Sequence, residues 1–307
     1  MPLHRGGQIA EAIRRGVGFL REQQLANGEF RSCHSPAGTR DGYWAAHPSP
    51  FVTTLVVDSL GSLPDAGLEA MRSRALGYLR SQQMSDGLCR YMDGLDPDAD
   101  TTSCVAFALE STGDPARPIA RDRLLANRNP RGLFYTWFRV AKARNDVDSA
   151  VNANVLLHLG ENDETRVVCD YLVGLVNRDE ESHSYWYYDD DLALYYFMSR
   201  AFRNGARSLS GATESIASKI DARTVDSSLW AALAIATLAN FESVTPATAA
   251  PFIDRILSDQ GSDGSWPVAA FMRNAGPGLM LRRPAMSYSG SEELTTAFCI
   301  EALSRMR

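Results

Sequence analysis

Two hydrophobic patterns alternate along the chain, and both are typical of helices. In the first, apolar residues lie on one side and Arg, Glu and Asp on the other, as in a surface helix. These segments are residues 9–25, 68–84, 119–127, 167–176, 209–220 and 247–257. In the second, nearly all sides are apolar, so a helix there must be buried. These segments are residues 51–63, 100–112, 148–160, 189–202, 226–241 and 291–306. Because no stretch alternates with a period of two, we do not expect strands.

A short repeat joins three of the amphipathic segments to the buried ones that follow them, and two degenerate copies keep its spacing from apolar to aromatic residue. An apolar residue is followed by Gln, then by Gly, and usually by an aromatic residue. The first and last copies are Leu20, Gln24, Gly28 and Phe30, and Ile256, Gln260, Gly264 and Trp266. Glycine supplies the left-handed residue that ends a helix, and the aromatic ring packs back over the turn. The sequence therefore predicts an all-α fold: one domain over residues 1–307, built as an (α/α)6 barrel (toroid) of six inner and six outer helices around a central cavity.

One interval does not fit this repeat. Residues 267–290 form a long stretch between Trp266 and the last buried segment. A loop of this length inside a compact domain is usually functional or disordered. Since the starts of all inner helices gather at one mouth of such a barrel, we expect residues 267–290 to form a lid there.

Composition narrows the class of protein. With 307 residues and 45% apolar content, the chain can bury a core without disulfide or metal staples. Its net charge of −6 argues against a nucleic-acid partner. Apolar runs fall short of the ~20 residues that span a bilayer, and the N-terminus lacks an apolar signal segment. We expect a cytoplasmic protein without a membrane span; transient membrane contact and the oligomeric state stay open.

Acidic and aromatic residues gather just before the buried segments. Asp98 and Asp100 precede the second one, and Asp146 and Asp148 precede the third at the same offset. An Asp at such a place is commonly a helix cap, which is our interpretation of Asp148. Aromatic residues form three clusters before the first, third and fourth buried segments: Tyr43, Trp44 and Phe51; Phe134 and Trp137; Tyr185, Trp186 and Tyr188.

Residues 98–102 read Asp-Ala-Asp-Thr-Thr and resemble the Asp-x-Asp-Thr-Thr motif of class II terpene cyclases, including the squalene–hopene type. The Gln…Gly-x-Trp turns resemble the repeat that those enzymes share with protein prenyltransferases. The resemblance covers the whole chain at the length of one barrel, so it implies a single-domain cyclase, an isomerase of the intramolecular lyase type. It also implies that Asp100 is the general acid, which protonates a linear polyprenyl chain and starts ring closure through carbocations.

This chemistry requires an Asp100 that is still protonated near neutral pH, although a free Asp titrates near ~3.9. Burial and the neighbouring carboxylate of Asp98 would both raise its pKa. Support for the acid is expected from Thr101 and from a hydrogen-bond donor to its second oxygen. The residues that could donate are Asn152, Asn154, His47 and His158. The three aromatic clusters would line the pocket, because aromatic faces stabilise cations without acting as bases.

The sequence lacks complete metal motifs for diphosphate ionisation: Ala193 follows Asp189 and Asp190 where a third acid is needed. We therefore expect no cofactor, and Mg²⁺ only if the substrate is a diphosphate. A prenylated aromatic or carboxylate acceptor, as in meroterpenoid pathways, is the preferred substrate. The basic residues available for its head group are Arg139, Lys142, Arg144, Arg282 and Arg283.

Two other interpretations stay open. Protein prenyltransferase subunits and lanthionine cyclases bind zinc on the same fold, and Cys33, His34 and Cys89 could supply ligands here. A non-catalytic toroid that binds a partner is the second.

Overall fold

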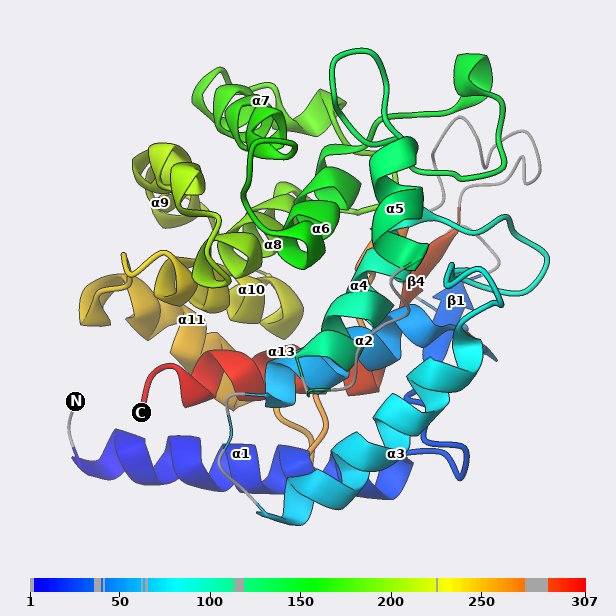
Figure 1. The fold of residues 1–307 in the computed structure, drawn as a ribbon. Helices are drawn as coiled ribbons and strands as arrows, with labels where there is room; N and C mark the ends of the chain where they lie inside the picture. Colours follow the sequence, from blue (N-terminus) through cyan, green and yellow to red (C-terminus); the bar gives the residue numbers. More distant parts are fainter. Residues whose placement is uncertain are drawn as a thin grey trace.

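The inner ring consists of six buried helices whose starts all lie at one end of the barrel. The computed structural model describes residues 3–35, 40, 42–61, 63, 66–111, 113, 119–224, 226–273 and 287–307. Within these residues the inner helices are α2 (Pro50–Leu60), α4 (Ala99–Glu110), α6 (Ser149–Leu159), α8 (Asp191–Arg203), α10 (Ser228–Asn240) and α13 (Glu292–Ser304). Each packs against the next, and α13 packs against α2, which closes the ring (Figure 1).

The outer layer alternates with the inner one along the chain. Its helices are α1 (Leu3–Gln23), α3 (Ala66–Gln82), α5 (Ile119–Ala126), α7 (Arg166–Asn177), α9 (Thr213–Asp221) and α11 (Pro246–Asp259). Three short 3-10 helices lie between them: η1 (Lys142–Arg144), η2 (Glu181–His183) and η3 (Arg207–Ala212). The predicted barrel of six inner and six outer helices is confirmed.

The repeat residues hold the outer helices to one another. The Gln24 side-chain amide donates to the carbonyl of Gly28 at 3.0 Å and to that of Met71 on α3 at 2.9 Å. Gln260 makes the same pair of bonds, to Gly264 at 3.0 Å and to Ala12 on α1 at 2.9 Å, so the last outer helix is tied to the first. The repeated glutamine therefore has a structural role.

A second set of repeated contacts joins each turn to the following inner helix. The backbone N–H groups of Phe30, Cys89 and Trp266 donate to the hydroxyls of Thr53, Thr102 and Thr296 at 3.0–3.1 Å. In the third repeat Asn152 takes the place of the threonine and accepts from the Phe134 N–H at 2.9 Å. The polar residues near the helix starts thus satisfy buried backbone donors.

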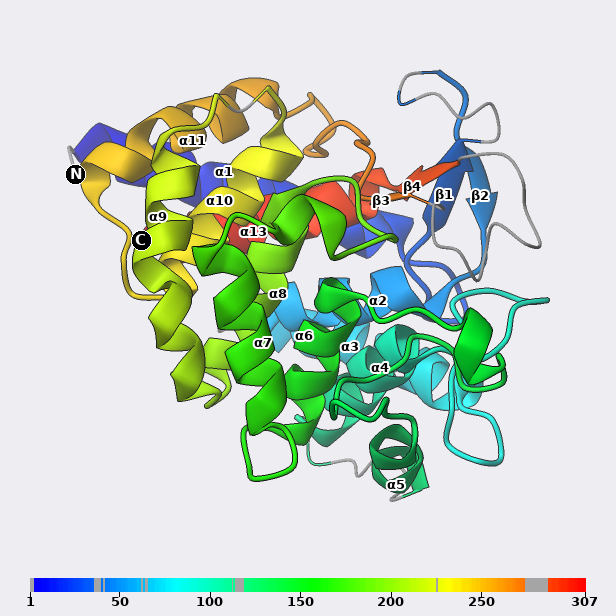
Figure 2. The same cartoon turned by 90° about the horizontal axis from the view of Figure 1, so that it is seen from above.

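A small antiparallel sheet lies at the mouth, contrary to the expectation that strands are absent. Its order is β2 (Ala45–His47), β1 (Ser32–Ser35), β4 (Tyr288–Gly290) and β3 (Met272–Arg273). Figure 2 shows these strands together at one end of the molecule, where α2 and α13 begin. The strands are two to four residues long, too short for a period of two to stand out in the sequence.

A cluster of aromatic rings packs in the centre of the barrel. The ring of Tyr188 lies 4.9 Å from that of Phe197 and 5.5 Å from that of Phe271 (centroid distances). Phe298 continues the cluster at 5.4 Å from Phe271. Of the expected lid over 267–290, residues 274–286 lie outside the described part of the chain. Among the helices that are described, none is long and apolar enough to cross a bilayer.

Candidate active site

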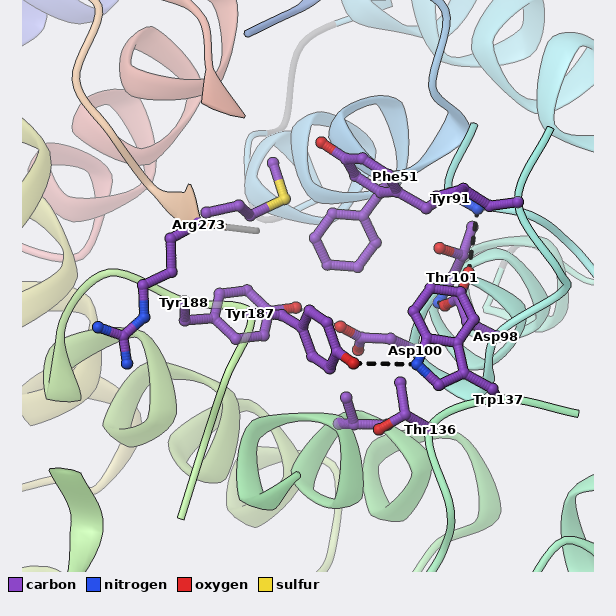
Figure 3. Close-up of a pocket in the computed structure, with 13 residues that line it drawn as sticks. Phe51, Tyr91, Asp98, Asp100, Thr101, Thr136, Trp137, Tyr187, Tyr188 and Arg273 are labelled. Carbon is purple, nitrogen blue, oxygen red and sulfur yellow. Dashed lines mark hydrogen bonds between the residues drawn. The ribbon is translucent and has the colours of Figure 1, made fainter. Parts of the chain in front are cut away.

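A pocket lies at the mouth, where α4 and α6 begin and the loops before α6 and α8 meet them. Six of the residues expected at the site line it: Phe51, Asp98, Asp100, Thr101, Trp137 and Tyr188. Seven further residues complete its wall: Tyr91, Leu95, Thr136, Val151, Tyr187, Met272 and Arg273. In Figure 3 the carboxyl of Asp100 lies in the middle of this group, between the tyrosines and Trp137.

Asp98 is the N-cap of α4. Its Oδ1 accepts the Thr101 N–H at 2.6 Å, and its Oδ2 accepts the Tyr91 N–H at 3.0 Å. Burial raises the pKa of Asp98 to about 7, in spite of these donors. Since both oxygens are held by backbone N–H groups, Asp98 fixes the start of α4 and thereby the position of Asp100.

Asp100 lies one residue inside the helix and presents its carboxyl to the pocket. Asn154 on α6 donates its Nδ2 to Oδ1 of Asp100 at 2.7 Å, and the Tyr188 hydroxyl donates to Oδ2. The residue is 8% exposed, and burial raises the pKa of Asp100 to about 6, while the bonds from Tyr188 and Asn154 oppose the rise. Burial is the leading cause of this shift in the pKa, and it is one of the two causes expected from the sequence, the other being the charge of Asp98.

The structure distinguishes among the expected donors to Asp100. Asn154 makes the bond. Asn152 instead uses its amide on the backbone of Phe134 and on the Asp148 carbonyl at 2.8 Å. His47 lies on β2, with its Nε2 3.1 Å from the Ser32 hydroxyl. His158 lies near the far end of α6, 3.2 Å from the Glu110 carboxylate.

Only part of the expected aromatic lining reaches the pocket. Phe51, Trp137 and Tyr188 do. Tyr43 is 75% exposed, and Trp44 is half-buried on the same surface loop. Phe134 is fully buried in the core, where its backbone is held by the structural Asn152.

The cluster before α8 divides in the same way. Tyr185 is buried and donates its hydroxyl to the Asp191 carboxylate at 2.8 Å. The backbone of Trp186 donates to Asp148 at 2.6 Å. Asp148 also accepts the N–H groups of Ala150 and Val151, which confirms that it caps α6.

Tyr187 belongs to a polar network on the pocket wall that the sequence did not reveal. Its hydroxyl donates to Asp146 Oδ1 and accepts from Trp137 Nε1, both at 2.9 Å. Thr136 donates to the other oxygen of Asp146 at 2.6 Å. The network fixes the two aromatic rings that face Asp100 from the side of α6 (Figure 3).

Arg273 is the basic residue that lines the pocket. It lies on β3, across the pocket from Trp137 (Figure 3), and its guanidinium stacks on the Tyr185 ring at 5.5 Å. The basic residues named from sequence lie elsewhere: Arg139 pairs with Asp86 at 3.3 Å, and Lys142 and Arg144 are exposed on η1. Arg282 and Arg283 fall outside the described residues.

No cluster of ligands supports the zinc interpretation. In the described part of the chain, no group of three or more His, Cys, Asp or Glu residues could hold a metal ion. Cys33 and His34 lie on β1, whereas Cys89 is fully buried under the start of α4.

The pocket encloses about 50 Å³. Sites for small molecules usually have at least ~300 Å³. An elongated ligand therefore needs side chains of the pocket wall to move apart.

The sequence and the fold of the chain can be compared with those of known proteins. No protein-family model matches the sequence, and no curated protein sequence matches it. Solved structures do match: the type II terpene cyclase MstE from Scytonema, as an Arg-to-Ala variant in complex with its substrate geranylgeranyl dihydroxybenzoate, superposes with a TM-score of 0.75. The match covers 98% of each chain at 18% sequence identity.

Two other solved structures show how widely this fold is used. ent-Copalyl diphosphate synthase from Streptomyces platensis superposes with a TM-score of 0.57 at 18% identity, over 83% of this chain and 50% of that one. An unsaturated glucuronyl hydrolase specific for heparin superposes with a TM-score of 0.59 at 11% identity, over 97% of this chain and 96% of that one. The chain thus has the toroid fold of type II terpene cyclases. The same fold carries other chemistry, so function has to be argued from the site.

Proposed function

We propose that the protein is a class II terpene or meroterpenoid cyclase, in which Asp100 protonates a linear polyprenyl chain. The observation that carries the proposal is a buried carboxyl with two hydrogen-bond donors in an aromatic pocket. With a pKa of about 6, a useful fraction of Asp100 is protonated near neutral pH. MstE, of the same fold, was solved with geranylgeranyl dihydroxybenzoate as substrate and with merosterolic acid A as product.

The reaction is balanced in atoms. The O–H bond of Asp100 breaks, and its proton forms a C–H bond at the terminal alkene, which leaves a tertiary carbocation. The next alkene attacks this cation and closes a ring, and each closure passes the charge along the chain. Loss of a proton from the last cation gives a product isomeric with the substrate. Asn154 and Tyr188 stabilise the carboxylate that forms, which makes Asp100 a stronger acid.

The aromatic wall supports the carbocation steps. Phe51, Trp137, Tyr187 and Tyr188 present rings around Asp100 (Figure 3). A cation over such a ring gains roughly 0.5–2 kcal/mol. Val151, Leu95 and Met272 complete an apolar surface that offers no strong base to a passing cation.

The position of Arg273 favours a substrate with an anionic head group. Its guanidinium lies at the opposite side of the pocket from Trp137, and its Nε is buried without a hydrogen-bond partner among the residues that the structure describes. A carboxylate or a phosphate would satisfy the guanidinium fork. A prenylated hydroxybenzoate with its chain toward Asp100 fits this polarity, and for such a substrate no metal is needed.

The test uses the purified protein and candidate substrates without added metal. Farnesyl and geranylgeranyl diphosphates and the corresponding prenylated dihydroxybenzoates are incubated separately, and products are identified by mass spectrometry and NMR. Cyclic isomers that vanish in Asp100→Asn, while the variant still binds substrate in calorimetry, would support the proposal. Substrate binding without any cyclic product would favour a non-catalytic binding protein.

A further inference from the structure

A buried arginine lies directly behind the donor of Asp100. Arg200, on α8, is 1% exposed and donates Nη1 to the side-chain oxygen of Asn154 at 3.2 Å. Asn154 in turn donates its Nδ2 to Asp100 Oδ1 at 2.7 Å. Three inner helices, α4, α6 and α8, thus contribute one residue each to a continuous chain of hydrogen bonds.

Arg200 is itself held rigidly on its other side. Its Nε donates to Asp58 Oδ2 on α2 at 2.8 Å. Its guanidinium lies 5.6 Å from the ring centroid of Tyr196 and 5.7 Å from that of Phe197. The planar guanidinium can hold two partners in fixed directions and stack on aromatic rings, which an ammonium group cannot do.

This arrangement decides which way the Asn154 amide points. An asparagine amide has an oxygen that accepts and a nitrogen that donates, and the two ends are similar in shape. Arginine can only donate, so the end that faces Arg200 must be the oxygen. The NH₂ group is therefore directed at Asp100. Without Arg200 the amide could turn over and place its oxygen against the carboxyl, where it would favour the protonated form.

We propose that Arg200 is a positioning residue for the general acid: it orients the Asn154 amide toward Asp100 and contributes its positive charge to the acid strength of that carboxyl. The inference rests on the proposed function, because it assumes that Asp100 is the proton donor. It adds a residue in the last turn of a buried helix, outside the pocket wall, to the residues on which the reaction depends.

The charged groups around Asp100 determine whether the loss of Arg200 raises or lowers the pKa of Asp100. The titratable and charged groups near it are Asp98 and Cys104 from α4 and its cap, Asp148 at the start of α6, Tyr188 before α8, Arg200 on α8 and Asp58 on α2 behind Arg200. Arg200 is the only cation in this set of described residues, and it lowers the pKa of Asp100. Removing it should raise that pKa by about one unit and weaken the acid.

The first experiment compares cyclisation rates from pH 4.5 to 9 in the parent, Arg200→Met, Asn154→Leu and the double variant. Arg200→Met should lower kcat at least tenfold and move the alkaline limb of the profile up by about one pH unit. The double variant should lose less than the product of the two single losses, because the orienting effect of Arg200 acts through Asn154 and only its charge acts directly on Asp100. Independent, multiplying losses with an unshifted limb would overturn the inference.

Arg203→Met is the matched control. Arg203 lies on the same helix and also pairs with Asp58, at 3.6 Å, but it bonds Asn240 and Glu301 instead of Asn154. Its loss should leave the pH profile in place. If Arg200→Met does not fold, Arg200→Lys is used in its place. Lysine keeps the positive charge but lacks the planar guanidinium that binds two partners at once. One ammonium group cannot hold both Asp58 and Asn154 in fixed directions, so this variant should lower kcat with a smaller shift of the alkaline limb than Arg200→Met. A full parental rate would contradict the inference.

A second readout needs no turnover. The carbonyl stretch of protonated Asp100, identified in infrared difference spectra by its loss in Asp100→Asn, is titrated in the parent and in Arg200→Met. Its midpoint should rise by about one unit in the variant, and an unchanged midpoint would overturn the role of Arg200. If the midpoint shifts but no polyprenyl substrate is cyclised by the parent, the proposed function fails while the coupling stands.

Discussion

The bond from Tyr188 to Asp100 allows a sharp prediction about pH dependence. The change is Tyr188→Phe, which removes one hydroxyl and leaves the ring in its aromatic cluster next to Phe197 and Phe271. The hydroxyl donates to Asp100 Oδ2, and among the causes that lower the pKa of Asp100 it is the largest. Its loss should therefore raise that pKa.

The magnitude follows from the strength of the bond. A hydrogen bond to a charged group is worth about 1.5–3 kcal/mol, and one pKa unit corresponds to about 1.4 kcal/mol. From its value of about 6, the pKa of Asp100 should rise by roughly one to two units. In the proposed mechanism the protonated form of Asp100 is the active one, so activity should be present below the pKa and lost above it. The alkaline limb should accordingly move from near pH 6 to about pH 7–8.

The assay measures kcat at saturating substrate from pH 4.5 to 9. The variant should also be slower at low pH, by about tenfold or more, because a weaker acid transfers its proton less readily. Tyr195→Phe is the control: it removes a buried hydroxyl that donates to Glu181 at 2.7 Å, away from Asp100. An alkaline limb that stays at the same pH in Tyr188→Phe, or that moves equally in the control, would refute the reasoning.

Three further predictions concern stability and binding. Because the pKa of Asp100 is raised from about 4 to about 6 on folding, its contribution to stability is complete below pH 4 and is lost as the pH rises through 6. Asp100→Asn should therefore have a higher Tm than the parent at pH 8 but not at pH 4, and equal differences at both would contradict this. Arg273→Ala should raise KM for a substrate with an anionic head group by about tenfold, with little change for a neutral analogue; equal effects on both would argue against head-group binding. Gly264 has a φ of +93°, and a Cβ there would lie 2.5 Å from the carbonyl oxygen of Arg15. Gly264→Ala should therefore lower the free energy of unfolding by more than about 2 kcal/mol. Gly160→Ala, at φ +71° and ψ 171° with nothing within 4 Å of the new Cβ, should cost about 1–3 kcal/mol from backbone strain alone in the same urea titration.

Much of the barrel was predictable because it is specified by local, repeated residues. The Gln24 and Gln260 amides make identical bonds in the first and last copies, so the pattern in the sequence reports directly on the contacts. The sheet was not predictable for the opposite reason. It pairs Cys33 with Gly290, from opposite ends of the chain, in strands too short to show a period.

Asp100 could be proposed as the acid from its motif, but its hydrogen-bond partners could not be predicted from the sequence. Asn152 and Asn154 are two residues apart on one helix and so face different directions. The rotation of α6 decides which one meets Asp100. The repeat held a usable signal, because Asn152 stands where Thr53 and Thr102 stand and could have been assigned to the turn. Arg200 also left a signal, as the charged residue within the buried stretch 192–202 of α8.

The most direct test of the central claim is to run the reaction in D₂O and to determine the mass of the product and the position of any deuterium in it. If Asp100 starts the cascade by protonation, exchange with solvent gives it a deuteron. Each cyclic product should then carry one deuterium on the carbon of the former terminal alkene, and Asp100→Asn should form no such product. A cyclic product without deuterium at that carbon, or one formed with release of diphosphate, would contradict proton-initiated cyclisation.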